Sequence, residues 1–380
     1  MAHTDINTLR GQVFSLPELL RQQYHDLEPK IRTLFSTPEI FSLRKILLSG
    51  CGDSYAAAMA VRSSFERLTH LPVEVVSAID LARFYRETCL GFAPNNPLVI
   101  ALSNSGTPAR VAEAAQRAAG KGAFVLGITG NPASPLGQYA SRILSLDIPS
   151  FPDAPGTRSY ITALLALLLI ALRIGEVRDR YTMDHAMAIR QDILDQADAL
   201  ERILPPMDRE MRELACSWQH LEAWDFVGAG PDYATAWYGH AKVFEATGRY
   251  AMHINSEEWL HLNFFIRSPK KIATVVIASS CNEGLSRTIE VIGYMRTLGR
   301  PLLIVTDRLP QCLDTAGLAV ALTPVSAFAD SLPIVQCAPV NLLIGYVMEL
   351  LQEKPGRGCE GPWAFARGGA AVRESEIILY

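Results

Sequence analysis

The sequence predicts an α/β protein built from two tandem repeats, each with a parallel sheet covered by helices on both faces. Short apolar runs alternate with helix-forming stretches of about a dozen residues, which is typical of parallel sheets. A strand–glycine–helix pattern also occurs twice, over 46–58 and 224–236, with its glycines, tyrosine and alanines in step. At 380 residues the chain is long enough for two hydrophobic cores.

The alternation predicts five parts in order along the chain. These are an N-terminal helical segment (1–42), a first α/β domain (43–176), a helical linker (177–218), a second α/β domain (219–352) and a C-terminal tail (353–380). We expect strands in the first domain near 45–49, 73–76, 99–102, 124–129 and 142–148. In the second domain we expect strands near 224–227, 272–280, 301–306 and 318–323. Pro205-Pro206 is expected to divide the linker into helices over 184–204 and 207–218.

Composition excludes several classes of protein. Hydrophobic residues make up 49% and charged residues 19% of the chain, and the formal net charge is −4. This balance indicates a globular protein without a basic surface for nucleic acid or membrane. The seven cysteines are scattered without a C-x-x-C pair, which favours a reducing cytoplasm and argues against a zinc site. The first residues lack a signal-peptide core, and the apolar run 161–172 is too short to span a bilayer.

An anion site is predicted where the apolar run 99–102 ends in Ser103-Asn-Ser-Gly-Thr107. Pro108 then opens a run of helix formers, so the N–H groups and positive end of a helix face this turn. The hydroxyls of Ser103, Ser105 and Thr107 add donors, and together they suggest a phosphate cradle. The alternative is an ordinary β-to-α turn. The second repeat has Ser279-Ser-Cys-Asn-Glu-Gly284 instead, where Glu283 would repel a phosphate, so we expect the anion only in the first repeat.

The segments Ser49-Gly-Cys-Gly-Asp-Ser-Tyr55 and Leu102-Ser-Asn-Ser-Gly-Thr107, in tandem α/β repeats, resemble the sugar isomerase (SIS) family of phosphosugar-binding domains. The resemblance covers roughly residues 25–350 and is strongest to the fructosamine-6-phosphate deglycases and the isomerase half of glutamine–fructose-6-phosphate aminotransferases. It implies two flavodoxin-like three-layer α/β/α domains with parallel sheets.

The resemblance also implies which residues of the first repeat hold the substrate. The phosphate would be held by Ser103, Asn104 and Ser105, and the sugar by Gly52 and Ser54.

Two positions depart from the family pattern. Pro108 replaces a hydroxyl residue, so we expect the cradle to depend on backbone N–H groups. Asp53 stands where the family often has Thr, which suggests that it faces the sugar hydroxyls or an amine.

A second segment, residues 239–261, resembles the aminotransferase K-x-x-E helix with an E-x-x-H run after it. Lys242, Glu245 and His261 match at the family spacing, and Lys242 is expected to contact the substrate. The resemblance implies that Glu245 moves a proton between C1 and C2 and that His261 acts on sugar oxygens. An aldose–ketose shift needs such a base and such an acid. The alternative is a solvated helix glutamate and a capping or core histidine.

In the family, this histidine usually comes from the neighbouring subunit. We therefore expect a homodimer or higher homo-oligomer with active sites at the subunit interface.

The expected reaction is narrowed by what the sequence lacks. Position 2 is Ala, and no glutaminase segment with its cysteine nucleophile precedes the first repeat. No lysine follows Lys354, whereas the aminotransferase forms a Schiff base through a lysine of its tail. Arg367 and Arg373 could contact phosphate but do not form Schiff bases. Tyr55 replaces the third glycine of a dinucleotide motif, and no metal motif is present, so no cofactor is expected.

The preferred hypothesis is a deglycase that cleaves a 6-phosphorylated sugar–amine adduct, such as a fructosamine 6-phosphate. The alternatives are a phosphosugar isomerase, an amino-sugar phosphate deaminase and a non-catalytic phosphosugar sensor.

Overall fold

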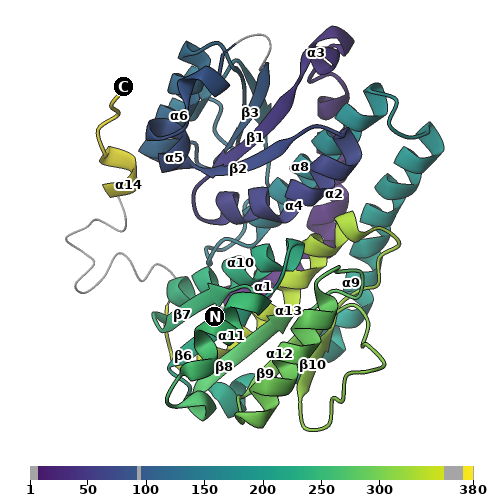
Figure 1. Ribbon diagram of the computed structural model, residues 1–380, viewed down its shortest axis with the longest axis vertical. Coiled ribbons are helices and arrows are strands. Elements are labelled where there is room, and N and C mark those ends of the chain that lie inside the picture. Colours follow the sequence, from purple (N-terminus) through teal and green to yellow (C-terminus); the bar gives the residue numbers. More distant parts are fainter. Residues whose placement is uncertain (1–6, 92–95, 355–370, 380) are drawn as a thin grey trace, which may run out of the picture. The chain divides into compact units, whose positions relative to one another are not determined.

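The computed structural model describes residues 7–91, 96–354 and 371–379, which form two compact units. The first unit comprises residues 19–91, 96–150, 158–191 and 371–379. The second unit comprises residues 7–18, 151–157 and 192–354. Each unit contains one five-stranded sheet in which every strand pair is parallel (Figure 1). This confirms the predicted fold class.

The first unit has its strands in the order β2-β1-β3-β4-β5. Its strands are β1 (Lys45–Gly50), β2 (Val73–Ser77), β3 (Pro97–Leu102), β4 (Phe124–Thr129) and β5 (Arg142–Ser145). Its helices are α3 (Thr37–Ser42), α4 (Asp53–Thr69), α5 (Ala78–Arg83), η1 (Glu87–Cys89), α6 (Ala109–Gly120), α7 (Pro135–Tyr139), α8 (Arg158–Val177) and α14 (Ala371–Glu374). This strand order is that of flavodoxin-like folds.

The second unit repeats the same plan, with strands in the order β10-β9-β8-β6-β7. Its strands are β6 (Ala223–Val227), β7 (Tyr250–Ile254), β8 (Ile272–Ile277), β9 (Leu302–Thr306) and β10 (Ala319–Leu322). Its helices are α1 (Thr8–Phe14), α10 (Pro231–Thr247), α11 (Ser256–His261), η2 (Asn263–Phe265), η3 (Pro269–Lys271), α12 (Leu285–Thr297), η4 (Ala329–Ser331) and α13 (Leu332–Leu350). The helices α2 (Leu16–Arg32) and α9 (Met183–Trp218) contribute residues to both units.

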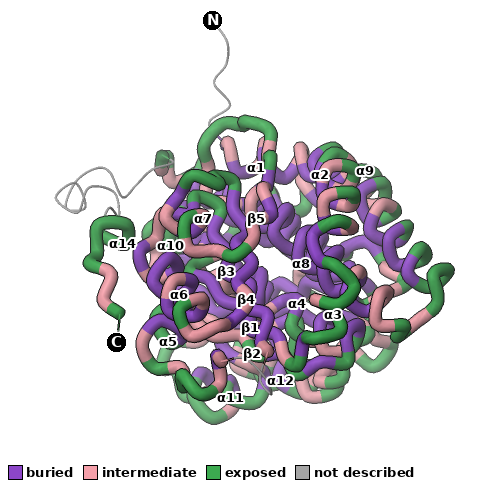
Figure 2. The backbone as a smooth tube through the Cα atoms, turned by 90° about the horizontal axis from the view of Figure 1, so that it is seen from above, coloured by how far each residue is buried: buried purple, intermediate pink, exposed green. Residues whose placement is uncertain are grey.

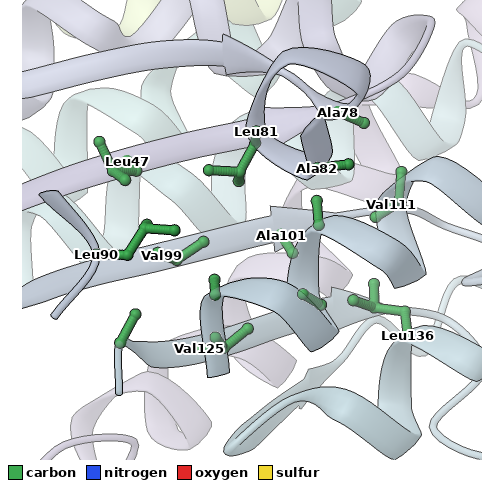
Figure 3. Packing of buried hydrophobic residues seen from close by; sticks show 14 residues of the cluster. Leu47, Ala78, Leu81, Ala82, Leu90, Val99, Ala101, Val111, Val125 and Leu136 are labelled. Atoms are coloured by element: carbon green, nitrogen blue, oxygen red, sulfur yellow. The ribbon is translucent and has the colours of Figure 1, made fainter. Parts of the chain in front are cut away.

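Each sheet is the middle layer of its unit. In the first unit α5 and α6 pack together on one face, and α4 and α8 pack together on the other. Figure 3 shows the layer under α5 and α6, where Leu47, Val99 and Val125 from three strands meet Leu81 and Val111 from the helices. The central strands are therefore buried along their length, whereas α14 is exposed (Figure 2). Burial on both faces explains why these strands are continuous apolar runs.

The strand β7 was missing from the expected elements. Its residues, Tyr-Ala-Met-His-Ile, lack the run of β-branched residues that marks the central strands. It lies at the edge of its sheet and pairs only with β6, and Tyr250 is exposed. An edge strand with partly polar, partly exposed residues has a weak sequence signal.

The expected division of the linker at Pro205-Pro206 is wrong. The structure has one helix, α9, with both prolines inside it. Each proline removes one N–H donor from the helix, which costs stability. The buried side chains of Leu200, Leu204 and Met207 continue on both sides of the prolines, and this continuous apolar face favours an unbroken helix.

Among the described residues, two helices, α8 and α13, are long and apolar enough to cross a membrane by length and composition alone. In the structure, 83% of the most apolar window of α8 is buried inside the protein. The most apolar window of α13 is fully buried. Such burial is typical of the core helices of a soluble protein.

A buried ion pair fixes the segment that carries His261. Arg300 donates from Nη1 to Asp225 Oδ2 at 2.6 Å, and both side chains are almost fully buried. Asn263 donates to the same carboxylate oxygen, and its own carbonyl oxygen accepts from Arg300 Nη2. The guanidinium also lies over the Trp259 ring at 5.2 Å. Through these contacts the sheet holds α11 and η2.

We predict that Asp225→Ala destabilises the protein by about 3–5 kcal/mol, because it leaves the buried Arg300 guanidinium without a counter-charge. The measurement is thermal and urea unfolding of the full chain. Glu66→Ala is the control: it breaks the exposed Arg62–Glu66 pair on α4 and should change stability by about 0.5 kcal/mol or less. Equal losses in the two variants would contradict the prediction.

Candidate functional site

A cavity of about 280 Å³ opens at the carboxyl edge of the first sheet. Its volume is close to the lower end of small-molecule sites, roughly 300 Å³. The residues that line it come from the segments at the ends of β1, β3 and β5, from the first turn of α4 and from the first two turns of α8: Cys51, Asp53, Ser54, Leu102, Ser103, Asn104, Ser105, Pro108, Leu146, Ser159, Tyr160 and Ala163. In open α/β sheets, ligands bind at this edge, where the strand order reverses.

Five of the predicted residues, Asp53, Ser54, Ser103, Asn104 and Ser105, lie together in this cavity. Gly52 does not line it; Gly52 adopts a positive φ of 56° and begins α4. Thr107 does not line it either, but its Oγ1 lies 2.9 Å from Ser105 Oγ and holds that side chain. The structure thus separates residues that border the cavity from residues that shape it.

The backbone of the loop after β3 offers N–H groups to the cavity. Ser103 N donates to Ile128 O and Gly106 N to Ser103 O and Oγ, which folds the loop back on itself. Among the residues that the structure describes, the N–H groups of Asn104 and Ser105 have no acceptor. Consecutive N–H groups near a helix N-terminus form an anion-binding concavity.

Two residues at or near the cavity, Ser159 and Arg110, were not predicted. Ser159 brings a hydroxyl from the first turn of α8, which the sequence marked only as an apolar helix. Arg110 lies close enough to act on Cys51: burial raises the pKa of the Cys51 thiol, and the Arg110 guanidinium partly offsets that rise. An arginine directly after Pro108-Ala109, in the first turn of a helix that faces an anion turn, was the available signal.

Arg110 also binds the C-terminal segment 371–379. Its Nη2 donates to Ser375 Oγ at 3.1 Å and to Glu376 O, and its Nη1 pairs with Glu113. Glu113 is fully buried and also accepts from Ile378 N at 3.0 Å. Arg373 lies on exposed α14, and Arg367 lies outside the described residues. The segment is thus attached to α6, the helix that follows the cradle.

In the second unit, Glu245 is held by Lys242 one helical turn earlier on α10. Lys242 is fully buried, and its Nζ donates to Glu245 Oε2 at 2.6 Å. The Glu245 side chain is 44% exposed, so the carboxylate lies at the surface of this unit while its partner lies in the core. Lys242, predicted as a substrate contact, is placed to position the carboxylate.

His261 ends α11 and is 64% exposed. Its Nε2 lies 3.4 Å from Glu257 Oε1, and Glu257 also pairs with Arg287 at 2.6 Å. Within the described part of this unit, no hydrogen bond joins His261 to Glu245. The two residues are therefore presented separately, each with a partner of its own.

Two other histidines, His240 on α10 and His253 on β7, lie in the same unit as Glu245. His240 and His253 have ring centroids 4.3 Å apart, next to Trp237 and Tyr233. Burial and then the charge of His240 lower the pKa of His253 to about 4. His253 is therefore unprotonated at neutral pH and unsuited as a general acid.

Gly106 generates a testable prediction about the cradle. It has a φ of 66°, and a methyl group there would overlap the Ser134 side chain, 2.5 Å from its Cβ. We predict that Gly106→Ala costs about 2 kcal/mol or more, from left-handed backbone and overlap together, and lowers the melting temperature. Gly120→Ala, at the end of α6 with open space around it, is the control and should be neutral or stabilising. A Gly106→Ala protein as stable as the control would contradict this geometry.

Comparisons with known proteins agree with this architecture. The SIS domain family matches residues 39–173. The glutamine–fructose-6-phosphate aminotransferase of Clostridium tetani is 26% identical over 317 residues, covering 82% of this chain and 50% of that protein. The chain thus spans about half the length of the curated relatives that it matches.

Solved structures share the fold across most of the chain. The C-terminal domain of glucosamine-fructose-6-phosphate aminotransferase from Francisella tularensis has a TM-score of 0.77 at 17% identity, covering 89% of this chain and 96% of that one. Tagatose-6-phosphate ketose/aldose isomerase from Escherichia coli has a TM-score of 0.71 at 15% identity, covering 92% and 95%. Residues 39–173 thus match the SIS domain, and the second repeat has the same strand order as the first.

Proposed function

We propose that this chain is an enzyme that binds a phosphosugar through the cradle of the first unit and moves a proton between C1 and C2 with Glu245. The Lys242–Glu245 pair carries the proposal. A carboxylate fixed through Oε2 by a buried lysine, on the exposed side of a helix, has the preorganisation that a base for carbon-bound protons needs. The cradle N–H groups of Asn104 and Ser105 supply an anchor remote from the reacting carbons.

The finer proposal is a deglycase acting on a fructosamine 6-phosphate. Glu245 removes a proton from C1 of the ketoamine, and the resulting enaminol takes the proton back at C2. His261 donates a proton to O2 as the enaminol forms, and it regains one from the amine nitrogen when the C1=N bond forms. The product is a C1 imine, which water hydrolyses to a hexose 6-phosphate and the free amine. No oxidant, reductant or cofactor is needed, since the shift is internal and the cleavage is hydrolytic.

Residue types in the tail favour a deglycase over a transaminating enzyme. Residues 355–380 contain arginines but no lysine, and arginine does not form a Schiff base with a ketose. The runner-up is an aldose–ketose isomerase or an amino-sugar phosphate deaminase, which would use the same pair. A non-catalytic sensor would bind the sugar phosphate and leave it unchanged.

A substrate panel separates these candidates. We would follow fructosamine 6-phosphates, hexose 6-phosphates and amino-sugar phosphates by NMR. Release of free amine and hexose 6-phosphate from the first class alone supports the deglycase.

The proposal includes a homodimer or larger homo-oligomer in the cytoplasm, with Glu245 and His261 of one site coming from different subunits. Each residue lies at the surface of the second unit with its own partner, Lys242 or Glu257. A Glu–His pair buried together within one chain would need no second subunit. Two exposed groups, by contrast, can each be completed into a site by a residue of a second subunit.

We predict that Glu245→Gln lowers turnover by about 10²–10⁴-fold, because the amide cannot take up the C1 proton. Binding of the sugar phosphate should stay within about twofold, since the cradle is unchanged. Glu210→Gln, an exposed glutamate on α9, is the control and should keep full activity. Unchanged turnover in Glu245→Gln would rule out this role.

We also predict that Glu245→Gln and His261→Asn chains, each inactive alone, regain activity when their subunits are mixed. A mixed dimer has one site with both native residues, so activity should reach up to about a quarter of the native value. Native mass spectrometry of isotope-labelled chains verifies the exchange. Complete exchange without activity would place both residues in one subunit.

A further inference from the structure

The two repeats have the same backbone at the turn after their first strand. Gly52 and Gly230 each begin the following helix, with φ of 56° and 52° and ψ of −131° and −127°. Counting on from these glycines, Ser54 of the first repeat corresponds to Asp232 of the second. The repeats therefore differ at this position by a carboxylate.

The strand registers give the matching positions in the next loop. Leu102 pairs with Ile128 in the first sheet, and Ile277 pairs with Val305 in the second. Ser103 N donates to Ile128 O, just as Ala278 N donates to Val305 O. Asn104 and Ser105 thus correspond to Ser279 and Ser280, and Gly130 corresponds to Asp307.

In the second repeat these corresponding N–H groups have acceptors. Ser279 donates to Asp232, from N to Oδ2 at 2.9 Å and from Oγ to Oδ1 at 2.5 Å. Ser280 donates to Asp307, from N to Oδ1 at 2.7 Å and from Oγ to Oδ2 at 2.6 Å. The N–H groups of Asn104 and Ser105 in the first repeat have none among the described residues.

Asp232 is built into the core of the second unit. It is 2% exposed and also accepts from Gln336 Nε2 at 2.9 Å and from Asn282 Nδ2 at 2.8 Å. Burial raises the pKa of this carboxyl, and these four donor groups oppose the rise. A buried carboxylate is stable only with such a donor set.

We propose that Asp232 and Asp307 are the resident anions of the second repeat: they occupy the N–H groups that a phosphate would occupy in the first repeat. The second repeat is an anion site closed by the chain itself. Each chain therefore binds one external phosphate. The charge that closes the second site comes from Asp232 and Asp307 and not from Glu283, which is exposed and accepts no hydrogen bond from the described residues.

The closure also positions the helix that carries Glu245. Asp232 lies in the first turn of α10 and Glu245 in its last, and the Asp232 carboxylate joins this helix to the β8 loop and to Gln336 of α13. Asp232 is thus a positioning residue that holds α10 before any ligand arrives. This last step rests on the proposed function; the closure of the site does not.

The test replaces each resident anion by its first-repeat counterpart. We expect Asp232→Ser/Asp307→Gly to bind two inorganic phosphates per chain, against one for the native chain, by isothermal titration. Its melting temperature should be lowered in chloride buffer and restored by phosphate at equal ionic strength. Gln336→Ala, which breaks the same network but keeps both carboxylates, is the control and should not be rescued by phosphate.

A converse variant keeps the test decisive if the double variant does not fold in chloride. Ser54→Asp should close the first site and weaken phosphate binding by about tenfold or more, through lost charge-assisted hydrogen bonds. A folded double variant with native stoichiometry, or native phosphate affinity in Ser54→Asp, would overturn the proposal. A native chain without phosphate binding, beside a double variant that binds one, would refute the proposed cradle but support the closure.

Discussion

Backbone N–H groups at the carboxyl edge of a parallel sheet need acceptors, and this requirement shapes both units. In each sheet the first and third strands of the repeat are adjacent, so the loops after β1 and β3, and after β6 and β8, meet at one edge. The third-strand loop turns its N–H groups outward as the next helix begins. In the first unit these groups border a cavity; in the second they end on aspartates. The same backbone thus leads to a ligand site in one case and to a closed core in the other.

The sequence predicted the architecture because its strongest signals come from burial. Central strands such as β3 and β8 are covered on both faces and are therefore unbroken apolar runs, and the repeated glycine turns marked the two repeats. The weak signals failed for physical reasons. The edge strand β7 has one exposed side, and the two prolines of α9 remove donors but leave the buried face of the helix intact. Local propensity was outweighed by packing in both places.

The candidate site was predicted where its residues are contiguous in the sequence. Ser103, Asn104 and Ser105 follow one strand, so a single motif identifies them, and they do line one cavity. Ser159 and Arg110 reach the same region from helices that carry no motif of their own. The charge expected to exclude phosphate from the second repeat was likewise chosen by its place in the sequence. Glu283 is the charge nearest in sequence, but Asp232 and Asp307 are the charges nearest in space.

In the proposed closure, two positions distinguish the repeats. A serine and a glycine leave an anion hole open, and two aspartates fill it. A site that takes its anion from solution is completed only when ligand binds, and ordering it then costs part of the binding free energy. A site with a resident anion is complete beforehand. If binding and proton transfer are divided between the units as proposed, the adaptable site recognises the phosphate and the closed one keeps the base in place. Preorganisation is worth most at the group that must meet the reacting carbon, and the proposed group, Glu245, is on the helix that Asp232 holds.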